Sequence, residues 1–409
     1  MGRPGGYAGR HGRIGVTEKR QDAEATRLIR AGTKPRALAR TVGPPIQRGS
    51  TVLMPDAASL YNHDHVTYGR GGLGMHEALA EALCELEGAT GVRLFPSGLA
   101  AVTAAAMAVL RAGDEVLVTD TAYAPSRRFF DKVLTRFGVR VTYFSPRSTP
   151  EQVLAAAGPA LRLIVMESPG SLTYEIQDLP AIAALARARE VLTLVDNTWA
   201  AGLLCKPLAL GVDISVQALT KYVTGHSDVF LGSAAAKDAR ITHALDEAVW
   251  NFGWSVSPDD AYQGLRGLRT LPTRLARHAQ NAALVANWLL DQPEVADVLY
   301  PPLPHSPDHA LWKRDFTGAN GLISVVFHPT SAASVDAMLD RLTLFGLGFS
   351  WGGFESLAIS SGDQLTHRRF PSGLAGPLMR LHIGLEDPAD LIADLRRGLD
   401  ALRDVQTRD

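Results

Sequence analysis

The stretch that decides the fold is SVQALTKYVTGHSD, from Ser215 to Asp228, near the middle of the 409-residue chain. It follows several apolar runs of strand length, and it places Lys221 among small and hydroxyl-bearing residues. Upstream, VLTLVDNTWAAG (Val191 to Gly202) contains an apolar run that ends in an acid, Asp196. By composition alone Lys221 is a surface lysine at the end of a strand. An acid after one strand and a lysine after the next predict instead two groups that flank one ligand.

Apolar runs of strand length alternate with helix-length segments through the middle of the chain. They are EVLVTD (Glu115 to Asp120), LRLIVMES (Leu161 to Ser168), VLTLVD (Val191 to Asp196) and DISVQAL (Asp213 to Leu219). Continuous apolar strands joined by helices predict a mainly parallel sheet that is covered on both faces. The predicted fold class is therefore α/β, with ligands at the carboxyl ends of the strands.

The segment VRLFPSGLAAVTAAAMAVLRAGD (Val92 to Asp114) is predicted to be a short strand, a turn and a long helix that begins at Pro96, Ser97 and Gly98. The first N–H groups of a helix have no partner within it, and they lie at the positive end of the helix dipole. This makes the start of the helix a natural phosphate seat. A capped helix without a ligand is the alternative for this segment taken alone.

The segment TYGRGGLGMHEALAEALCELEG (Thr67 to Gly88) contains a Gly-x-Gly-x-x-Gly pattern at Gly69, Gly71 and Gly74, which is typical of dinucleotide-binding proteins. Its context argues against a nicotinamide dehydrogenase, because the preceding residues are too few and too polar for a central strand. Tyr68 and Arg70 are predicted to contact a phosphate, since a hydroxyl and a planar guanidinium suit an anion. The alternative is a loop that packs against the preceding arm.

Four regions are predicted along the chain. They are a flexible Gly/Arg-rich extension (1–21), an arm that contacts a neighbouring subunit (22–66), a large ligand-binding domain (67–267), and a linking helix with a smaller C-terminal α/β domain (268–409). The arm contains a short helical stretch at Ala23–Ala31. Residues 266–290 are predicted to form one long helix, and the smaller domain is expected to contain strands at Gly321–Phe327 and Met379–Leu385.

Composition restricts the classes of function. The formal net charge is -1, with 46% hydrophobic and 20% charged residues, so nothing predicts binding to nucleic acid or to a membrane surface. Cys84 and Cys205 fit neither a disulfide framework nor a zinc site, and a cytoplasmic location is expected. His63 and His65 flank Asp64 but lack a third ligand group, so no metal is predicted.

Four features share one explanation. A helix start for phosphate (Gly98 and Leu99), an aromatic residue after a strand (Tyr123 in TDTAYAPS), an acid after a strand (Asp196) and a lysine after a strand (Lys221) are the parts that hold pyridoxal phosphate. The carboxylate would keep the pyridine nitrogen protonated, and the lysine would form a Schiff base with the cofactor.

The motifs that carry this chemistry resemble a known family. VDNTWAAG, ALTKYVTGHSD, TYGR, YQGLRGLRTLPTRLARH, SWGGFESL and RLHIGLEDPADLIADL are similar to the cysteine/methionine-metabolism group of fold-type I pyridoxal phosphate (PLP) enzymes. The resemblance runs from about Asp22 to the C-terminus. It implies a homotetramer, built as a pair of dimers, in which a neighbouring subunit completes each active site.

The resemblance also assigns roles to residues. It implies Lys221 as the Schiff-base lysine, Asp196 as the partner of the pyridine nitrogen, and Tyr123 as the ring that stacks on the cofactor. The expected phosphate ligands are Gly98, Leu99 and Thr220 of the same subunit, with Tyr68 and Arg70 of the neighbour. Arg380 is expected to bind the substrate α-carboxylate, helped by Ser350 and Trp351. A lysine that acts as a base near neutral pH needs its pKa lowered by burial or by a nearby cation.

Within the family the motifs favour the branch that breaks a carbon–sulfur bond at the β-carbon. The expected reaction removes the α-proton of cystathionine and releases homocysteine, pyruvate and ammonia, a step of methionine biosynthesis. The γ-specific relatives usually carry Glu-Ser-Pro-x-Asn-Pro where this chain has ESPGSL (Glu167 to Leu172), and a small or aliphatic residue where Trp351 stands. A γ-specific enzyme, a β-lyase on another thioether amino acid such as a cysteine S-conjugate, and an inactive binder of the same fold are the alternatives.

Three features of the sequence differ from the β-lyase pattern. Gly71 stands where a second arginine is usual, Arg127 and Arg128 occupy a turn where an acid is common, and Trp250 stands where the partner commonly contributes a tyrosine. All three are expected to lie in the outer pocket, where the distal half of the substrate binds. The reaction class is therefore better defined by the sequence than the substrate.

Overall fold

The structure is a computed structural model that describes residues 41–62 and 66–406. One compact unit begins at Pro44. The predicted extension (1–21), the helical stretch at Ala23–Ala31, and the group His63 to His65 lie outside the described residues. In the described part of the arm the single turn of helix η1 is Ala58–Tyr61.

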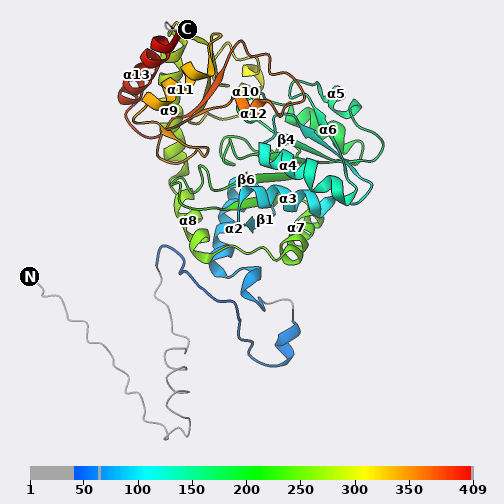
Figure 1. Ribbon diagram of the computed structural model, residues 1–409. Helices are drawn as coiled ribbons and strands as arrows, with labels where there is room; N and C mark the ends of the chain where they lie inside the picture. Colours follow the sequence, from blue (N-terminus) through cyan, green and yellow to red (C-terminus); the bar gives the residue numbers. More distant parts are fainter. Residues whose placement is uncertain (1–40, 63–65, 407–409) are drawn as a thin grey trace, which may run out of the picture. The chain divides into compact units, whose positions relative to one another are not determined.

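A seven-stranded sheet forms the centre of the unit (Figure 1). Its strands, in spatial order, are β1 (Gly91–Phe95), β7 (Gly232–Ala236), β6 (Ile214–Ala218), β5 (Leu192–Asp196), β4 (Leu161–Glu167), β2 (Glu115–Thr119) and β3 (Arg140–Phe144). The five strands from β6 to β3 are parallel, and β7 runs antiparallel to both of its neighbours. The α/β fold class with a mainly parallel sheet is confirmed.

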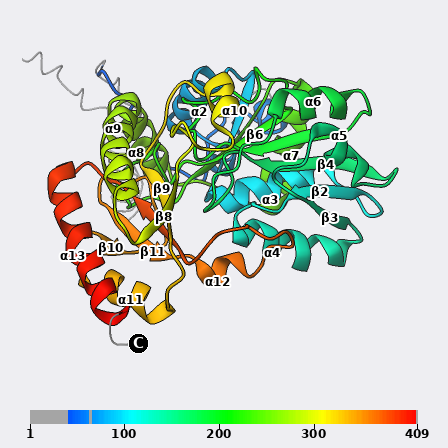
Figure 2. The ribbon, with the colours of Figure 1, turned by 90° about the horizontal axis from the view of Figure 1, so that it is seen from above.

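Helices cover both faces of this sheet, because alternate residues of each strand point to opposite sides. Val116, Val118 and Val165 pack with α3 (Gly98–Val109), α4 (Ala124–Lys132) and α7 (Ala239–Phe252). Leu117 and Ile164 pack on the other face, with α2 (Gly74–Glu87) and α6 (Leu179–Arg187). Figure 2 shows α4 and α6 on opposite sides of the sheet. The short helices η2 (Gly69–Gly71), η3 (Leu134–Phe137) and α5 (Pro150–Ala155) lie in the connections.

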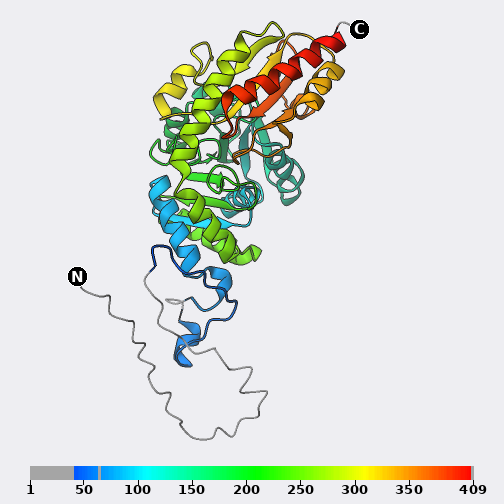
Figure 3. The ribbon, with the colours of Figure 1, turned by 90° about the vertical axis from the view of Figure 1, so that its left-hand side faces the viewer.

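A second sheet of five strands follows in the C-terminal part. Its order is β10 (Gly346–Leu347), β11 (Leu357–Ser360), β12 (Leu378–His382), β9 (Leu322–Phe327) and β8 (Val295–Leu299). The helices of this part are α10 (His309–Asp315), α11 (Ala332–Arg341), α12 (Gly362–Leu365) and α13 (Pro388–Gln406). Figure 3 shows α13, in red, beside α11, in orange, and the buried Leu391, Leu395 and Leu399 of α13 join the core of this sheet.

The prediction of one long helix over 266–290 is wrong. The chain forms α8 (Pro258–Leu268) and α9 (Leu271–Leu290), with Thr270 between them outside the helical conformation. Pro272 is the second residue of α9. Proline has no N–H to donate and its ring clashes with a preceding helical turn, so it fits the start of a helix and not its interior. The predicted domain boundary at 267/268 falls in the last turn of α8, and the division into domains stays a prediction.

The glycine pattern near residue 70 has no dinucleotide-binding geometry. Tyr68 forms an isolated antiparallel bridge with Thr51, and Gly69 donates its N–H to the Ser50 carbonyl at 2.7 Å. The pattern therefore follows a single bridge to the arm and not a central strand, and the loop packs on the arm. Among the helices of the described residues, none is long and apolar enough to cross a membrane.

Candidate active site

Three ionisable side chains lie at the carboxyl ends of neighbouring parallel strands. Asp196 is the last residue of β5, and it is in register with Glu167, the last residue of β4. Lys221 follows the end of β6 in a tight turn, where its N–H donates to the Ala218 carbonyl at 3.2 Å. The parallel register brings these strand ends to one edge of the sheet, where ligands of α/β proteins bind.

Lys221 is held against the C-terminal sheet. Its Nζ donates to Ser350 Oγ at 2.9 Å and lies 5.2 Å from the centre of the Trp351 ring. Burial, helped by the positive charge of Arg380, lowers the pKa of Lys221 to about 8, while Asp196 acts in the opposite direction. This amine therefore has the lowered pKa that a base near neutral pH requires.

Asp196 is fixed by Thr198, a residue for which the sequence suggested no role. The N–H of Thr198 donates to Asp196 Oδ1 at 3.0 Å, and its hydroxyl donates to the same oxygen. The Thr198 oxygen also accepts the N–H of Ala218 at 2.8 Å, which ties Asp196 to the end of β6. Burial raises the pKa of Asp196, and the Thr198 bonds and the charge of Lys221 counteract this rise.

The start of α3 lies against β6 close to the lysine turn. Ser97 caps the helix by accepting the N–H of Ala100 at 3.1 Å. A Cβ atom on Gly98 would lie 2.3 Å from the Ala218 Cβ, so only glycine permits this approach. The N–H groups of Gly98 and Leu99 belong to the first turn and have no partner within the helix. Such N–H groups suit a phosphate, and the role of Gly98 and Leu99 as phosphate ligands stays a prediction.

Thr220 makes its hydrogen bonds elsewhere in this structure. Its hydroxyl donates to the Leu231 carbonyl at 3.1 Å and accepts the Leu231 N–H at 2.9 Å. To bind a phosphate, the Thr220 hydroxyl would have to donate its hydrogen bond to the phosphate and not to the Leu231 carbonyl. The role of Thr220 as a phosphate ligand stays a prediction.

Arg380 lies in the middle of β12 and is almost fully buried, with 5% of its surface exposed. Its two Nη atoms donate to the carbonyls of Gly348, Phe349 and Ser350 at 2.9–3.1 Å. Its Nε is buried, and none of the residues that the structure describes accepts a hydrogen bond from it. Leaving a buried N–H group without an acceptor costs free energy. The Nε–H of Arg380 is therefore a donor that a carboxylate could satisfy.

Two residues that the sequence did not single out hold the loop that carries Ser350 and Trp351. His382, two positions beyond Arg380 on β12, accepts the Gly352 N–H at 3.1 Å. Tyr222 contacts the Trp351 ring with 5.5 Å between the ring centres. Gly352 has a φ of +88° and lies against the backbone of the lysine turn, so a glycine is needed there.

Tyr123 immediately precedes α4 and is half exposed. Its backbone N–H donates to Glu167 Oε2 at 2.6 Å. Burial raises the pKa of its phenol, with smaller effects from the charges of Glu167 and Asp196, while Arg380 lowers it. The predicted stacking tyrosine therefore lies in the electrostatic field of the same acids and the same arginine that surround Lys221.

Tyr68 and Arg70 form a separate cluster. The Arg70 guanidinium lies 4.9 Å from the Trp250 ring and 5.9 Å from the Tyr68 ring, and within the part of the chain that the structure describes neither residue bonds to Lys221 or Asp196. A Cβ atom on Gly71 would lie 2.7 Å from the Trp250 ring. The unusual residues Gly71 and Trp250 are thus explained together, because the indole ring occupies the space that a side chain at position 71 would need.

The expectation that Arg127 lies in the outer pocket is wrong. Its Nη1 forms an ion pair with Asp120 at 2.6 Å, and its side chain is 7% exposed. The guanidinium also lies 4.1 Å from the Tyr143 ring centre, and Nη2 donates to the His367 carbonyl at 2.7 Å. A buried charge needs a partner, and Asp120 supplies it. Arg128, next to it, is exposed.

The residues present fit the cofactor that the sequence predicts. A partly buried carboxylate (Asp196) lies near a lysine whose pKa is lowered, and the first N–H groups of α3 have no partner inside the helix. The buried Arg380 keeps its Nε without an acceptor among the described residues, and this donor suits a substrate carboxylate. Among the described residues no group of three or more His, Cys, Asp and Glu could hold a metal ion.

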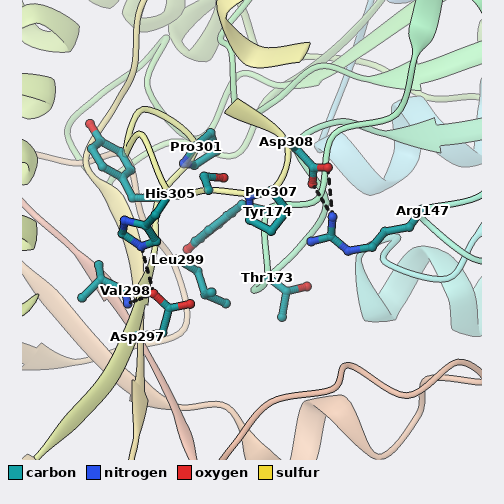
Figure 4. A pocket seen from close by; sticks show the side chains of 12 residues that line it. Arg147, Thr173, Tyr174, Asp297, Val298, Leu299, Pro301, His305, Pro307 and Asp308 are labelled. Atoms are coloured by element: carbon teal, nitrogen blue, oxygen red, sulfur yellow. Dashed lines mark hydrogen bonds and ion pairs between the residues drawn. The ribbon is translucent and has the colours of Figure 1, made fainter. Parts of the chain in front are cut away.

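A separate hollow lies between the loop after β4 and the loop after β8 (Figure 4). Arg147 pairs there with Asp308 at 2.9 Å, and His305 with Asp297 at 3.0 Å. None of the predicted site residues lines this hollow. The arginine, histidine and aspartate side chains of this hollow are thus paired with one another.

Known proteins resemble this chain over most of its length. A model of the family Cys/Met metabolism PLP-dependent enzyme matches residues 25–400. The chain is 41% identical to the cystathionine beta-lyase of Bordetella avium over 94% of its own length and 98% of that protein. It is also 41% identical to the cystathionine beta-lyase of Escherichia coli K12, over 91% of this chain and 97% of that protein.

A solved structure has a similar fold. It is the cystathionine gamma synthase of Xanthomonas oryzae pv. oryzae in complex with aminoacrylate and cysteine, with a TM-score of 0.82 and 34% identity. The match covers 88% of this chain and 94% of that one.

Proposed function

The chain belongs to the Cys/Met metabolism family of PLP-dependent enzymes, and from this we propose that it is a carbon–sulfur β-lyase that cleaves cystathionine to homocysteine, pyruvate and ammonia. The cofactor is pyridoxal phosphate. The observation that carries the proposal is the position of the Lys221 amine, which bonds to Ser350 Oγ and has a pKa lowered to about 8 by burial and by Arg380.

Pyridoxal phosphate, when bound, supplies a ring that stabilises negative charge at the α-carbon of an amino acid. Lys221 would hold the cofactor through its Nζ, and Asp196 would keep a proton on the ring nitrogen. Gly98 and Leu99 would bind the phosphate through their N–H groups, with Thr220 beside them. Tyr123 would stack on the ring.

The chain's own residues would then move the protons. The Lys221 Nζ, where it does not hold the cofactor, would take the α-proton of the substrate, which requires a neutral amine near pH 7. The unpaired Nε of Arg380 would donate to the substrate α-carboxylate, because a guanidinium matches a carboxylate better than an ammonium does. Ser350 and Trp351 border Nζ and would limit the access of water to it.

Two features support the β-position as the point of cleavage. Ser171 stands where the γ-specific relatives carry asparagine, and its hydroxyl bonds to Glu167. Trp351 stands where they carry a smaller residue, and its ring contacts both the Tyr222 ring and the amine of Lys221. The solved gamma synthase of similar fold makes a γ-specific enzyme the second candidate.

The proposal includes a homotetramer in the cytoplasm, in which Tyr68 and Arg70 reach the phosphate of a neighbouring subunit. The 47% exposure of Tyr68 supports this, as does the fact that, among the described residues, neither Tyr68 nor Arg70 bonds to Lys221. Mixing an Arg70→Ala variant with a Lys221→Ala variant tests it. If subunits share sites, hybrid assemblies contain some sites with both residues intact and regain activity. Mixtures that stay inactive after subunit exchange has been verified would contradict sharing.

Product analysis with cystathionine tests the reaction. Homocysteine with pyruvate is the expected outcome, whereas cysteine with 2-oxobutyrate would replace the proposal with a γ-lyase. Lys221→Ala should be inactive, and Lys313→Ala is the matched control because Lys313 is exposed on α10. No turnover of cystathionine, with turnover of another cysteine thioether, would keep the β-lyase chemistry and change the substrate.

A further inference from the structure

Glu167 is a partly buried acid to which the chemistry above gives no task. It ends β4 in register with Asp196, the last residue of β5. Side chains that are in register on adjacent strands point to the same face of the sheet, so the two carboxyl groups are neighbours. Two carboxyl groups that share a buried site do not both ionise readily. One of the pair therefore carries a proton, and the protein must determine which one.

The contacts of Glu167 lead to the stacking tyrosine. Its Oε2 accepts the Tyr123 backbone N–H at 2.6 Å, and its Oε1 bonds to the Ser171 hydroxyl at 2.5 Å. Ser171 in turn donates its N–H to the Thr121 carbonyl at 2.9 Å, and its carbonyl accepts from Arg368 Nη2 at 2.7 Å. Glu167 thus connects the loop after β4, through Ser171, to the backbone of Tyr123.

The surroundings of the two carboxyl groups raise the pKa of Glu167 and favour the anion of Asp196. Burial and the charge of Asp196 raise the pKa of Glu167 to about 8, against the bonds from Ser171 and Tyr123 and the more remote Arg368. Burial also raises the pKa of Asp196, but Thr198 and the positive charge of Lys221 favour its anion. At neutral pH the shared proton therefore belongs to Glu167.

We propose that Glu167 is a positioning residue that acts as a neutral carboxylic acid. It holds the Tyr123 backbone so that the phenol ring lies over the cofactor, and it leaves Asp196 as the single anion at the ring nitrogen. A charged side chain at 167 would hold Tyr123 equally well but would place a second negative charge beside Asp196. The inference rests on the proposed function only for the cofactor and its stacking tyrosine.

Four variants of the cofactor-loaded protein test this without substrate. Glu167→Gln keeps the shape and is neutral, so its oxygen can accept from Tyr123. Glu167→Ala and Glu167→Asp lose that bond, the second because it is one methylene shorter. Ser171→Ala is the matched control, since it removes the other bond to the same carboxyl group. The measurements are the dissociation constant of pyridoxal phosphate, the visible circular dichroism of the bound cofactor, and the midpoint pH of its visible absorbance change.

Glu167→Gln is expected to match the wild type in all three measurements, and Ser171→Ala to stay close to it. Glu167→Ala and Glu167→Asp are expected to bind the cofactor about tenfold more weakly, for the loss of one buried hydrogen bond, with reduced circular dichroism. A midpoint that moves to lower pH by about one unit in Glu167→Gln would mean that wild-type Glu167 is an anion, and would overturn the proposal.

Wild-type dichroism and affinity in Glu167→Asp would likewise overturn the positioning role. If Glu167→Ala does not fold, the Glu167→Gln and Glu167→Asp variants still test both the positioning role and the neutral state of the acid. Because no substrate is present, a failure to cleave cystathionine would reject the proposed substrate and leave this inference standing.

Discussion

Replacing Gly98 with alanine tests the phosphate seat at the start of α3. The new Cβ would lie 2.3 Å from the Ala218 Cβ, which is 1.1 Å short of the 3.4 Å at which ordinary contact begins. The helix start must therefore retreat from β6 by about 1 Å, and overpacking of this size costs about 1–3 kcal/mol. The better helix propensity of alanine recovers less than about 1 kcal/mol of that.

The same retreat moves the N–H groups of Gly98 and Leu99 away from the phosphate. Loss of one hydrogen bond to a charged group costs about 1.5–3 kcal/mol, which corresponds to a roughly 10- to 100-fold weaker binding of pyridoxal phosphate. Titration of the cofactor-free protein, followed by visible absorbance, measures the affinity, and thermal unfolding measures the stability. Gly362→Ala is the matched control, because Gly362 also begins a helix and a Cβ there meets nothing within 4 Å. If Gly98→Ala binds the cofactor as the wild type does, α3 is not the phosphate seat.

Three further predictions concern charged residues. Arg380→Lys should raise the KM for the amino acid about 10- to 100-fold, since the substrate carboxylate loses a charge-assisted bond; an unchanged KM would remove Arg380 from substrate binding. In cofactor-free protein the rate of covalent cofactor uptake should rise with pH, reach half of its maximum near pH 8 and level off above that, because burial and Arg380 lower the pKa of Lys221 to about 8. Arg380→Met should move this midpoint to higher pH. A wild-type rate that still rises steeply at pH 10 would contradict the assignment. Arg127→Met should lower the free energy of unfolding by about 3–5 kcal/mol, because the buried carboxylate of Asp120 loses its cation and, among the described residues, keeps only the N–H groups of Arg369 and Phe370. Exposed Arg128→Met should change it by less than about 0.5 kcal/mol. Equal effects in denaturant unfolding would refute the assignment.

The fold was predictable where one local signal dominates. Strands β2, β4, β5 and β6 are continuous apolar runs, and the start of α3 follows from Pro96 and Ser97. Strand β7 (Gly232–Ala236) carries no such signal, because its sequence GSAAA has low strand propensity and it is stable only between β1 and β6. The break between α8 and α9 could have been predicted from Pro272, since proline is favoured in the first turn of a helix.

The site residues were predictable when each stands in its own motif, as Lys221 and Asp196 do. Thr198 and His382 act through other residues, and their roles appear only once β5, β6 and β12 are placed. Arg127 shows the limit most clearly. Its position after the stacking tyrosine predicts a pocket residue, but the partner that buries it, Asp120, precedes that tyrosine at the end of a strand, and sequence spacing does not show which way either side chain points.

The central claim is that Lys221 is the lysine that carries the cofactor. Borohydride reduction of the cofactor-loaded protein, followed by proteolysis and mass spectrometry, identifies the modified lysine directly. The predicted result is one phosphopyridoxyl group, on the peptide that contains Lys221. Modification of Lys206 instead, the other partly buried lysine whose pKa is lowered, would contradict the assignment and the site built around it.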